Sequence, residues 1–438
     1  MCDAGVAGGS IPAVTPRVAH VVLALALVAA SAGLCAQATD QAPSVIVVGI
    51  DGFRPDYLER ADVPALRRLA AQGVRGEGLI PPFPSKTFPS FTTIATGQLP
   101  VHHGIVSNTM NDPDIPGRFT LSDHDTRSDP RWWLGEPIWI SAERQGVRAA
   151  GMFWPGDDVE IQGRRPSDWR TYDDHFPDAA RIDVVLEWLS RPVAERPRLV
   201  MLYFSLVDTA SHSFGPSSPE ALASASAADA LLGRLTDGLA ARGLDASTNL
   251  VVVSDHGMAE TVPGRVIVLD DYLDLSAVDV IETGPTVQLR PKDDARLTAA
   301  ARAAWSRSTV AALAHRHPHM AIYRGNALPA RFRYRGSVRI PPVLGLADDG
   351  WMILTRAQRD RRVDQGGRVR GEHGFDPAAR SMHGLFVASG PAFRQGLRVP
   401  AFESRHLYAL LCRVLGITPS RNDGDPRVLA KTLRARPR

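Results

Sequence analysis

The sequence predicts an α/β fold with a mostly parallel central sheet flanked by helices, and a smaller α+β subdomain inserted into it. Several apolar runs lack polar alternation, which is typical of parallel strands buried on both faces. Helical patterns alternate with these runs, and that alternation favours a parallel sheet. Three of the runs lead into an aspartate, which places acidic groups where such sheets bind their ligands.

The N-terminus has the pattern of a secretory signal peptide. Residues 20–35 (HVVLALALVAASAGLC) are apolar, follow Arg17 and precede the A-x-A sequence at 36–38. A basic flank, a short apolar core and a small-residue cleavage site are its three parts. We therefore expect residues 1–38 to be removed. Lipidation at Cys35 or a retained anchor is the alternative.

Composition limits the class of protein. The mature chain, residues 39–438, keeps Cys412 as its one cysteine, so it has no intrachain disulfide. Export without disulfides fits a periplasmic or secreted protein large enough to bury its own core. The formal net charge of +3 comes from interspersed charges, which gives no sign of nucleic-acid binding. No run in the mature chain is long enough to span a membrane.

Four apolar runs are the expected strands of the sheet. They cover residues 44–50, 199–207, 249–253 and 384–388. Helical patterns at 64–73 and 221–242 lie between them. The first three runs lead to Asp51, Asp208 and Asp255. Because the carboxyl ends of parallel strands meet at one edge of a sheet, we expect these carboxylates to share a site.

Residues 262–370 are less regular and are predicted to form the inserted α+β subdomain, with antiparallel strands in segments such as RVIVLDDYL and TVQLRP. This segment contains His315, His317 and His319 in HRHPH. No carboxylate motif accompanies these histidines, so we expect an exposed loop there rather than a metal site.

Acidic and histidine residues in short, glycine-flanked motifs are candidate metal ligands. They are Asp51 in VVGIDGFRPDY, Asp208 and His212 in VDTASHSFGP, Asp255 and His256 in VVVSDHGM, and His373 in GEHGFD. Aspartate and histidine without cysteine indicate a catalytic divalent-metal site, with zinc as the leading ion. The set is large enough for two ions, and two-metal sites suit phosphoryl transfer. We therefore expect a metal-dependent phosphodiesterase.

The spacing within these motifs limits their geometry. Asp208 and His212 are four residues apart, which places them on one helical face or around one tight turn. Asp255 and His256 are adjacent and can converge only in a loop, where Gly257 is expected to supply backbone freedom. Each motif alone is equally typical of a strand-end carboxylate with a hydrogen-bonded histidine. Their joint occurrence favours the metal site.

Thr87 and Asn108 are the candidate catalytic groups that carry no charge. Thr87, in FPSKTFPSF, precedes the helical pattern FTTIATG. A threonine hydroxyl becomes a nucleophile when a metal or base lowers its pKa, and a helix N-terminus favours the alkoxide. The alternative is that Thr87 or Ser90 caps the helix. Asn108 could offer an amide to a phosphate oxygen, or be a turn asparagine.

Six stretches resemble the nucleotide pyrophosphatase/phosphodiesterase family of the alkaline phosphatase superfamily. They are GIDGFRPDYL, FPSKTFPSFTTIATGQLPVHHGIVSN, WWLGEPIWISAERQGV, MFWPGDD, SDHGM and GEHGFD. The resemblance runs from about residue 45 to 425. It implies an alkaline phosphatase-like fold and zinc-dependent hydrolysis of phosphodiester or pyrophosphate bonds, which releases a nucleoside monophosphate through a covalent threonyl intermediate.

The resemblance also implies a role for each candidate residue. The ligands of a nucleophile-side zinc are Asp51, Thr87, Asp255 and His256, and those of a second zinc are Asp208, His212 and His373. The implied nucleophile is Thr87, with Asn108 as a transition-state donor. The implied nucleobase slot contains Phe88, Tyr172 and Tyr203.

Two departures from the family pattern bear on these assignments. Ser211 precedes His212 where the family usually has glycine, which is expected to tighten a loop and to leave the ligand in place. His383, in SMHGLF, is a rival to His373 as the third ligand of the second zinc. We favour His373, because its His-Gly pair lies in the family's loop while His383 enters a strand.

Several related functions stay open on the sequence alone. One is a choline- or lipid-headgroup phosphodiesterase of the same family, and another is a phosphate monoesterase. Monoesterases usually bind the dianion with arginine or extra metal, whereas Asn108 occupies that motif here. A sulfatase is disfavoured because TFPSF lacks the cysteine or serine and the arginine of those enzymes. A non-catalytic exported metal- or nucleotide-binding protein would have no need of Thr87.

Overall fold

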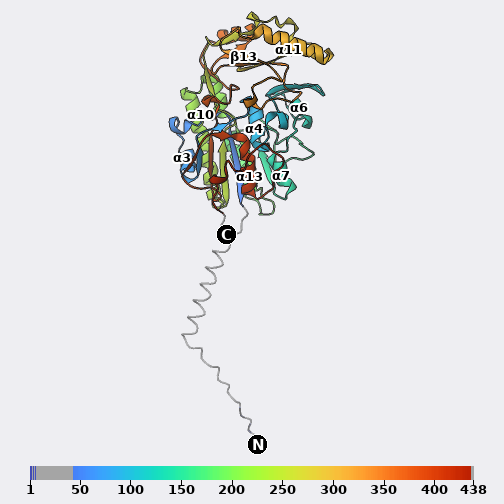
Figure 1. The fold of residues 1–438 in the computed structure, drawn as a ribbon. Helices are drawn as coiled ribbons and strands as arrows, with labels where there is room; N and C mark the ends of the chain where they lie inside the picture. Colours follow the sequence, from blue (N-terminus) through green and yellow to red (C-terminus); the bar gives the residue numbers. More distant parts are fainter. Residues whose placement is uncertain (2, 4, 6–42, 436–438) are drawn as a thin grey trace. The chain divides into compact units, whose positions relative to one another are not determined.

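The structure is a computed structural model that describes residues 1, 3, 5 and 43–435. The chain divides into two units at residue 43, and the second, Pro43–Arg438, contains the fold (Figure 1). Apart from residues 1, 3 and 5, the predicted signal peptide lies outside the described residues. Within the described part of the chain, no helix combines the length and the apolar character needed to cross a membrane.

A seven-stranded sheet forms the centre of the second unit within the described residues. Its order is β18 (Leu397–Val399), β2 (Val74–Gly76), β17 (Phe386–Ser389), β8 (Thr248–Val253), β1 (Ser44–Ile50), β7 (Leu199–Phe204) and β6 (Ala149–Met152). Strands β8, β1, β7 and β6 are parallel, whereas β17 runs antiparallel to β8 and β2. The predicted mostly parallel α/β sheet is confirmed.

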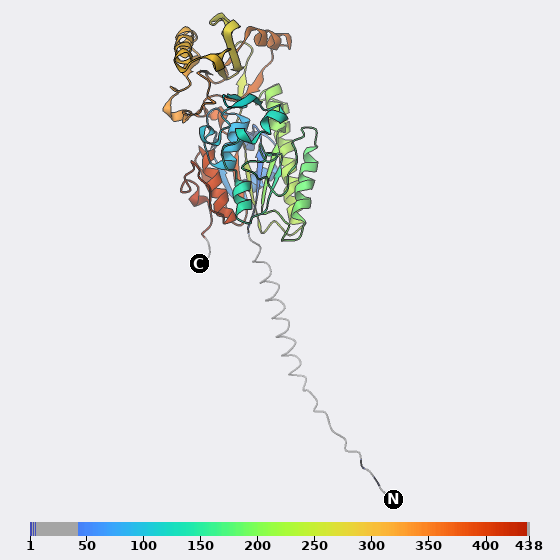
Figure 2. The same ribbon diagram turned by 90° about the vertical axis from the view of Figure 1, so that its right-hand side faces the viewer.

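Helices cover both faces of this sheet (Figures 1 and 2). On one face lie α3 (Pro64–Gln72), α8 (Asp178–Leu189) and α10 (Pro219–Ala240), which pack on one another and on β17 and β7. On the other lie α4 (Thr87–Thr96), α7 (Ile138–Arg144) and α13 (Leu407–Leu415). The start of α10 is fixed by Ser218, which accepts a hydrogen bond from the Ala221 amide, and by proline at the first helical position.

The predicted strand at 199–207 is too long. Strand β7 ends at Phe204, and α9 (Leu206–Phe214) begins two residues later. The apolar run continues because Leu206 and Val207 pack into the core from the first turn of this helix. Asp208 therefore lies in a helix and not directly at the end of a strand.

The segment predicted as an insertion contains a four-stranded antiparallel sheet among its described residues. Its order is β11 (Val278–Glu282), β12 (Thr286–Pro291), β14 (Val343–Ala347) and β13 (Met320–Arg324), with α11 (Ala299–Leu313) packed against it. These elements share a second apolar cluster. His317 and His319 lie after α11 beside Trp351, and His319 Nδ1 is 2.9 Å from Asp348 Oδ2. Neither histidine belongs to a group of potential metal ligands among the described residues.

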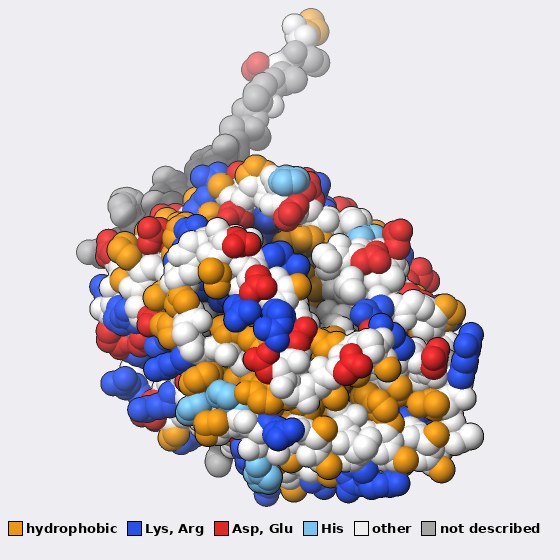
Figure 3. Space-filling model, turned by 90° about the horizontal axis from the view of Figure 1, so that it is seen from above, with side chains coloured by type: hydrophobic (Ala, Val, Ile, Leu, Met, Phe, Trp, Pro, Cys, Tyr) orange, Lys and Arg blue, Asp and Glu red, His pale blue; other side chains and the backbone are white. Residues whose placement is uncertain are grey.

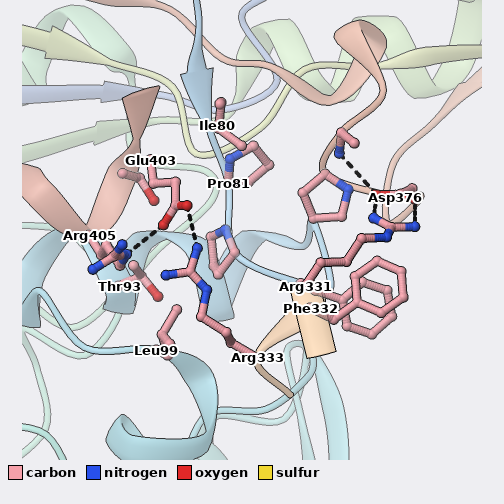
Figure 4. Close-up of a pocket in the computed structure, with 15 residues that line it drawn as sticks. Ile80, Pro81, Thr93, Leu99, Arg331, Phe332, Arg333, Asp376, Glu403 and Arg405 are labelled. Carbon is pink, nitrogen blue, oxygen red and sulfur yellow. Dashed lines mark hydrogen bonds and ion pairs between the residues drawn. The ribbon is translucent and has the colours of Figure 1, made fainter. Parts of the chain in front are cut away.

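The segment 330–333 packs against loops of the central domain (Figure 4), and Phe332 belongs to the large apolar cluster of that domain. The Phe332 ring stacks on Phe83 with 4.3 Å between centroids, and Arg331 donates to Asp376. Arg333 and Arg405 both point to Glu403. A cavity of about 240 Å³ lies between these side chains. The charged groups around this cavity are paired with one another, so they join the segment 330–333 to loops of the central domain.

The face seen from above carries interspersed acidic and basic side chains, with no large patch of one sign (Figure 3). This view agrees with the charge distribution expected from the sequence.

Candidate metal centre and active site

The carboxyl ends of β1 and β8 bring three candidate ligands together. The strands are parallel with Gly49 opposite Val253, so the residues after them emerge at the same edge. Asp51, Asp255 and His256 each offer one ligand atom within 4.8 Å of the others, and we name them the inner ligand group. His256 Nε2 lies 2.9 Å from Asp255 Oδ2 and 3.4 Å from Asp51 Oδ1.

The loop that carries Asp255 and His256 is held by Ser254 and by close packing at Gly257. The Ser254 hydroxyl donates to the His256 carbonyl at 2.6 Å and accepts from the Phe53 amide at 2.9 Å. A Cβ at Gly257 would lie 2.2 Å from the Ser381 carbonyl oxygen. The expected reason for this glycine was wrong: its φ is not positive, and what it permits is close approach of two backbones.

Helix α9 and the loop after β16 (Arg370–Glu372) form a second set. Asp208, His212 and His373 also have ligand atoms within 4.8 Å of one another, and we name them the outer ligand group. Asp208 Oδ1 is 3.4 Å from His212 Nε2 and 3.9 Å from His373 Nε2. The spacing of four residues places Asp208 and His212 on one helical face, in the first and last turns of α9.

Two expectations from the sequence, on Ser211 and on His383, concern this region. Ser211 lies inside α9 and is fully buried, so it does not tighten a loop. Its hydroxyl is 3.4 Å from the Tyr57 hydroxyl. His383 belongs to neither ligand group among the described residues, whereas His373 belongs to the outer one.

The two groups are adjacent because β1 turns sharply at its end. Gly52 has a φ of +67°, and a Cβ there would lie 2.9 Å from the Asp208 Cα. Helix α9 can therefore pack directly on the turn after Asp51. The rings of His256 and His373, one from each group, stack with 3.5 Å between centroids.

Each of the three histidines is oriented by the main chain. His256 Nδ1 is 2.9 Å from the Gly257 carbonyl oxygen, His373 Nδ1 is 2.9 Å from that of Ser85, and His212 Nδ1 is 3.0 Å from that of Gly371. A carbonyl can only accept, so Nδ1 carries the proton in all three rings. In the neutral ring Nε2 keeps its lone pair, as in histidine metal ligands.

Three carboxylate oxygens in these groups lack the partner that burial normally requires. Among the described residues, Asp51 Oδ1, Asp208 Oδ1 and Asp255 Oδ2 are buried without a hydrogen-bond partner. Burial and the carboxylates of Asp255 and Asp208 raise the pKa of Asp51 well above its usual value, and burial also raises the pKa of Asp208. Cations next to these oxygens would supply the missing counter-charge, so the residues fit a pair of metal ions.

Thr87 lies beside the inner ligand group at the N-terminus of α4. Its Oγ1 is 3.3 Å from His256 Nε2. The helix begins at Thr87 itself, with Lys86 as the N-cap residue and no side-chain cap. Neither Thr87 nor Ser90 therefore caps the helix, and the buried Ser90 hydroxyl has no partner among the described residues. The positive end of the α4 dipole favours negative charge on the Thr87 oxygen.

Asn108 is held against the start of the same helix. Its Oδ1 accepts a hydrogen bond of 2.9 Å from the Phe88 amide. This bond leaves the amide nitrogen of Asn108 as the donor available to a ligand. Asn108 is thus tied to the first turn of the helix that begins at Thr87.

The predicted aromatic residues line a pocket of about 620 Å³ that also contains Asp51, Thr87 and Asp208. Phe88, Tyr172 and Tyr203 all contribute to its wall. The Tyr203 hydroxyl also donates to Asp51 Oδ2 at 2.7 Å. Burial and the nearby Asp51 raise the pKa of Tyr203 well above its usual value, so this phenol stays a donor.

Sequence reasoning missed other residues around this pocket. Trp133, Phe153, Arg127 and Asp158 also line it. The motif MFWPGDD contains Phe153 and Asp158, and that match was the available signal. Arg127 lies over the Tyr172 ring at 5.4 Å, a contact across the pocket wall that could not be predicted from the sequence.

Comparisons with known proteins match most of the chain. The model of the type I phosphodiesterase / nucleotide pyrophosphatase family matches residues 45–376. The chain is 37% identical over 390 residues to an uncharacterised pyrophosphatase/phosphodiesterase of Schizosaccharomyces pombe, an alignment that covers 87% of this chain and 78% of that protein. It is 35% identical over 391 residues to ectonucleotide pyrophosphatase/phosphodiesterase family member 1 of Mus musculus. That alignment covers 88% of this chain but only 42% of the mouse protein.

Solved structures show the same fold. Murine ectonucleotide pyrophosphatase/phosphodiesterase 5, an inactive threonine-to-alanine variant in complex with AMP, superposes with a TM-score of 0.82 at 32% identity. The match covers 90% of this chain and 100% of that one. The human protein of the same name also gives a TM-score of 0.82, at 33% identity with the same coverage.

Proposed function

The chain belongs to the type I phosphodiesterase / nucleotide pyrophosphatase family, and on that premise we propose that it is a zinc-dependent hydrolase of phosphodiester or pyrophosphate bonds in nucleotides. The observation that carries the proposal is the Thr87 hydroxyl, 3.3 Å from His256 Nε2 beside carboxylate oxygens without partners. A protein that only binds nucleotides or metals has no need of such a hydroxyl.

In this proposal the inner ligand group and Thr87 hold one zinc ion, and the outer ligand group holds the other. Both sets consist of oxygen and imidazole nitrogen donors, which suit zinc. When bound, the two ions lower the pKa of the threonine hydroxyl and stabilise charge on the phosphoryl oxygens. The hydrogen bond from Tyr203 orients Asp51 within the inner group.

The residues of the chain divide the reaction into two displacements. Thr87 Oγ1, after loss of its proton, attacks phosphorus, and the bond from phosphorus to the leaving oxygen breaks. Water then attacks the threonyl phosphoryl group, and the bond to Oγ1 breaks with return of a proton to Thr87. The amide of Asn108 donates to a non-bridging oxygen in both transition states. The products are a nucleoside monophosphate and the leaving group.

The aromatic wall of the pocket supports a nucleotide substrate. A nucleobase can stack on Phe88 and Tyr172, which line the same cavity as Thr87. The murine relative that matches this fold was solved in complex with AMP. The predicted signal peptide supports a periplasmic or secreted location, where extracellular nucleotides would be the substrates.

A side-by-side turnover assay tests the proposal against its alternatives. We expect kcat/KM for a nucleotide phosphodiester to exceed that for a phosphate monoester by at least about tenfold, which needs about 1.4 kcal/mol of discrimination. The reason is that the neutral side chain of Asn108 is better suited to the single negative charge of a diester than to the two charges of a monoester. Equal or reversed ratios would contradict the proposed class, and preferential turnover of a choline phosphodiester would move the enzyme to headgroup substrates.

A further inference from the structure

A single buried carboxylate links the antiparallel sheet to the active site. Glu282 is the last residue of β11, and its Oε1 lies 2.5 Å from Lys86 Nζ. The side chains of Lys86 and Glu282 are only 7% and 12% exposed. The other oxygen, Oε2, accepts hydrogen bonds of 2.8 Å from the Ser107 hydroxyl and 2.8 Å from the Gln288 amide.

The two partners of Glu282 in the central domain are the immediate neighbours of the catalytic groups. Lys86 precedes Thr87, and Ser107 precedes Asn108. The Phe88 amide closes this arrangement by donating to Asn108 Oδ1 at 2.9 Å. The segments that carry Thr87 and Asn108 are therefore joined twice. One link is the hydrogen bond between the Phe88 amide and Asn108, and the other runs through Glu282.

A shift in strand register directs Glu282 toward these partners. Val280 lies opposite Leu289, but Glu282 lies opposite Gln288, so β11 contains one extra residue at this point. Such bulges change the direction in which a side chain points and are frequent beside active sites. Without the extra residue, residue 282 would share the face of Val278 and Val280, whereas with it Glu282 lies on the face of Asp279.

Stability alone does not account for this pair. Removing two charges from water costs several kcal/mol, and a buried ion pair seldom stabilises more than an apolar pair of the same size. What an ion pair with both oxygens engaged does provide is a fixed geometry. An error of about 1 Å in the placement of reacting groups can slow a reaction about a hundredfold.

We propose that Glu282 is a positioning residue for the proposed phosphodiesterase reaction: by holding Lys86 and Ser107, it sets the separation between the Thr87 oxygen and the Asn108 amide. This role rests on the proposed function. It also gives the antiparallel sheet a part in catalysis, although no residue of that sheet belongs to either ligand group.

The test compares Glu282→Gln with Asp279→Asn in full-length, zinc-loaded protein. Asp279 lies on the same strand and pairs with Arg118 and Arg290, but contacts neither Lys86 nor Ser107. With a nucleotide phosphodiester, we expect Glu282→Gln to lower kcat about thirtyfold or more, with KM within about threefold of wild type and two zinc ions retained. Asp279→Asn should change kcat by less than about twofold.

The double variant Lys86→Met/Glu282→Gln separates positioning from charge balance. It removes both buried charges, so thermal stability should return close to that of the wild type while kcat stays low. Recovery of wild-type kcat would overturn the proposal, because Glu282 would then serve only to neutralise Lys86. Equal kcat in Glu282→Gln and Asp279→Asn would overturn it as well.

Ser107→Ala keeps the test decisive if the Glu282 variants do not fold. It removes one hydroxyl between Glu282 and the segment of Asn108, and we expect kcat to fall about fivefold at unchanged KM. An unchanged kcat would contradict the proposed link. Failure of the proposed function would appear differently, as a wild-type enzyme without turnover of the diester.

Discussion

The two ligand groups contain the same kinds of atoms but differ in how the fold holds them. The inner group emerges from two central strands, and its side chains are at most 3% exposed. The outer group comes from a helix and a loop, and its members range from 8% exposed for His373 to 32% for His212. Thr87, the proposed nucleophile, contacts the inner group.

This difference in exposure indicates that the inner group is held rigidly, whereas a metal ion at the outer group would exchange more readily. Parallel strands in the middle of a sheet are the most protected part of a domain, so the inner group keeps its geometry during turnover. Helix α9 begins beside the pocket, with Asp208 and Thr209 in its wall. The outer group is therefore the more exposed of the two.

The largest expected effect is beside the inner group, at the proposed nucleophile. Thr87→Ala should lower kcat by about 10³-fold or more, since it removes the attacking oxygen and retains Asp51, Asp255 and His256. Thr87→Ser should keep measurable activity because its hydroxyl remains. The rate of phosphodiester hydrolysis, measured together with the zinc content of each variant, tests this prediction. Near wild-type turnover by Thr87→Ala would show that water attacks directly. Thr96→Ala, at the far end of α4, is the matched control.

Loss of the outer group should have the next largest effect. We expect His212→Ala to bind one zinc ion per chain instead of two and to lower kcat about a hundredfold, because charge on the phosphoryl group loses one of its two counter-ions. Elemental analysis and turnover measure the two effects. His317→Ala, which alters a histidine outside both groups, should leave both unchanged. Two bound ions in fully active His212→Ala would contradict the assignment of the outer group.

Acidification should weaken zinc binding at the outer group, because the metal must displace protons there. Burial lowers the pKa of His212, but the carboxylates of Asp208 and Glu372 raise it by more, and the net shift is upward. Burial raises the pKa of Asp208 as well, whereas burial and the nearby His256 and His212 lower that of His373 well below 6.5. Zinc binds the deprotonated forms, so a raised pKa weakens binding as pH falls.

For each proton displaced, the apparent zinc affinity of the outer group should fall about tenfold per pH unit below the raised pKa of His212. Competition with a chelator of known affinity between pH 7.5 and 5.5 measures this slope. Calorimetry in buffers of different ionisation enthalpy counts the protons released. An affinity that does not change over this range would show that the site is already deprotonated.

The smallest expected effect comes from removing a hydroxyl group that orients the inner group. Tyr203→Phe removes the 2.7 Å hydrogen bond to Asp51 but keeps the ring in the pocket wall. At saturating zinc we expect kcat to change by less than about threefold, and zinc affinity to weaken about tenfold, the low end for such supporting contacts. Zinc titration of the metal-free protein measures the affinity. A loss of kcat as large as that of His212→Ala would mean that Tyr203 contacts the substrate.

The sequence was sufficient to predict the strand ends, because an apolar run followed by Asp51 or by Ser254-Asp255 has one natural placement in a parallel sheet. It was also sufficient to group His373 with Asp208 and His212, through the family resemblance. It misplaced the end of β7, since Leu206 and Val207 are as apolar in a helix as in a strand. Periodicity carries no signal for that difference over so short a run.

Contacts between distant segments could not be predicted from the sequence, for a different reason. The Tyr203 hydroxyl appeared as part of an aromatic slot, and its bond to Asp51 depends on two neighbouring strands ending in register. Glu282 attracted no attention because one extra residue in β11 breaks the alternation from which its direction would be inferred. Such a shift follows from packing of the whole sheet and not from local propensity.

The orientation of the three histidines has a consequence for how this site can evolve. Its supports are main-chain oxygens of Gly257, Ser85 and Gly371, and no point mutation deletes a carbonyl. Selection must act on the path of the chain instead. A Cβ at Gly371 would lie 2.4 Å from the Ser211 carbonyl oxygen, as one at Gly257 would lie 2.2 Å from that of Ser381. Side chains around the site can therefore change, whereas any other amino acid at these two glycines would displace the main chain that orients the histidines.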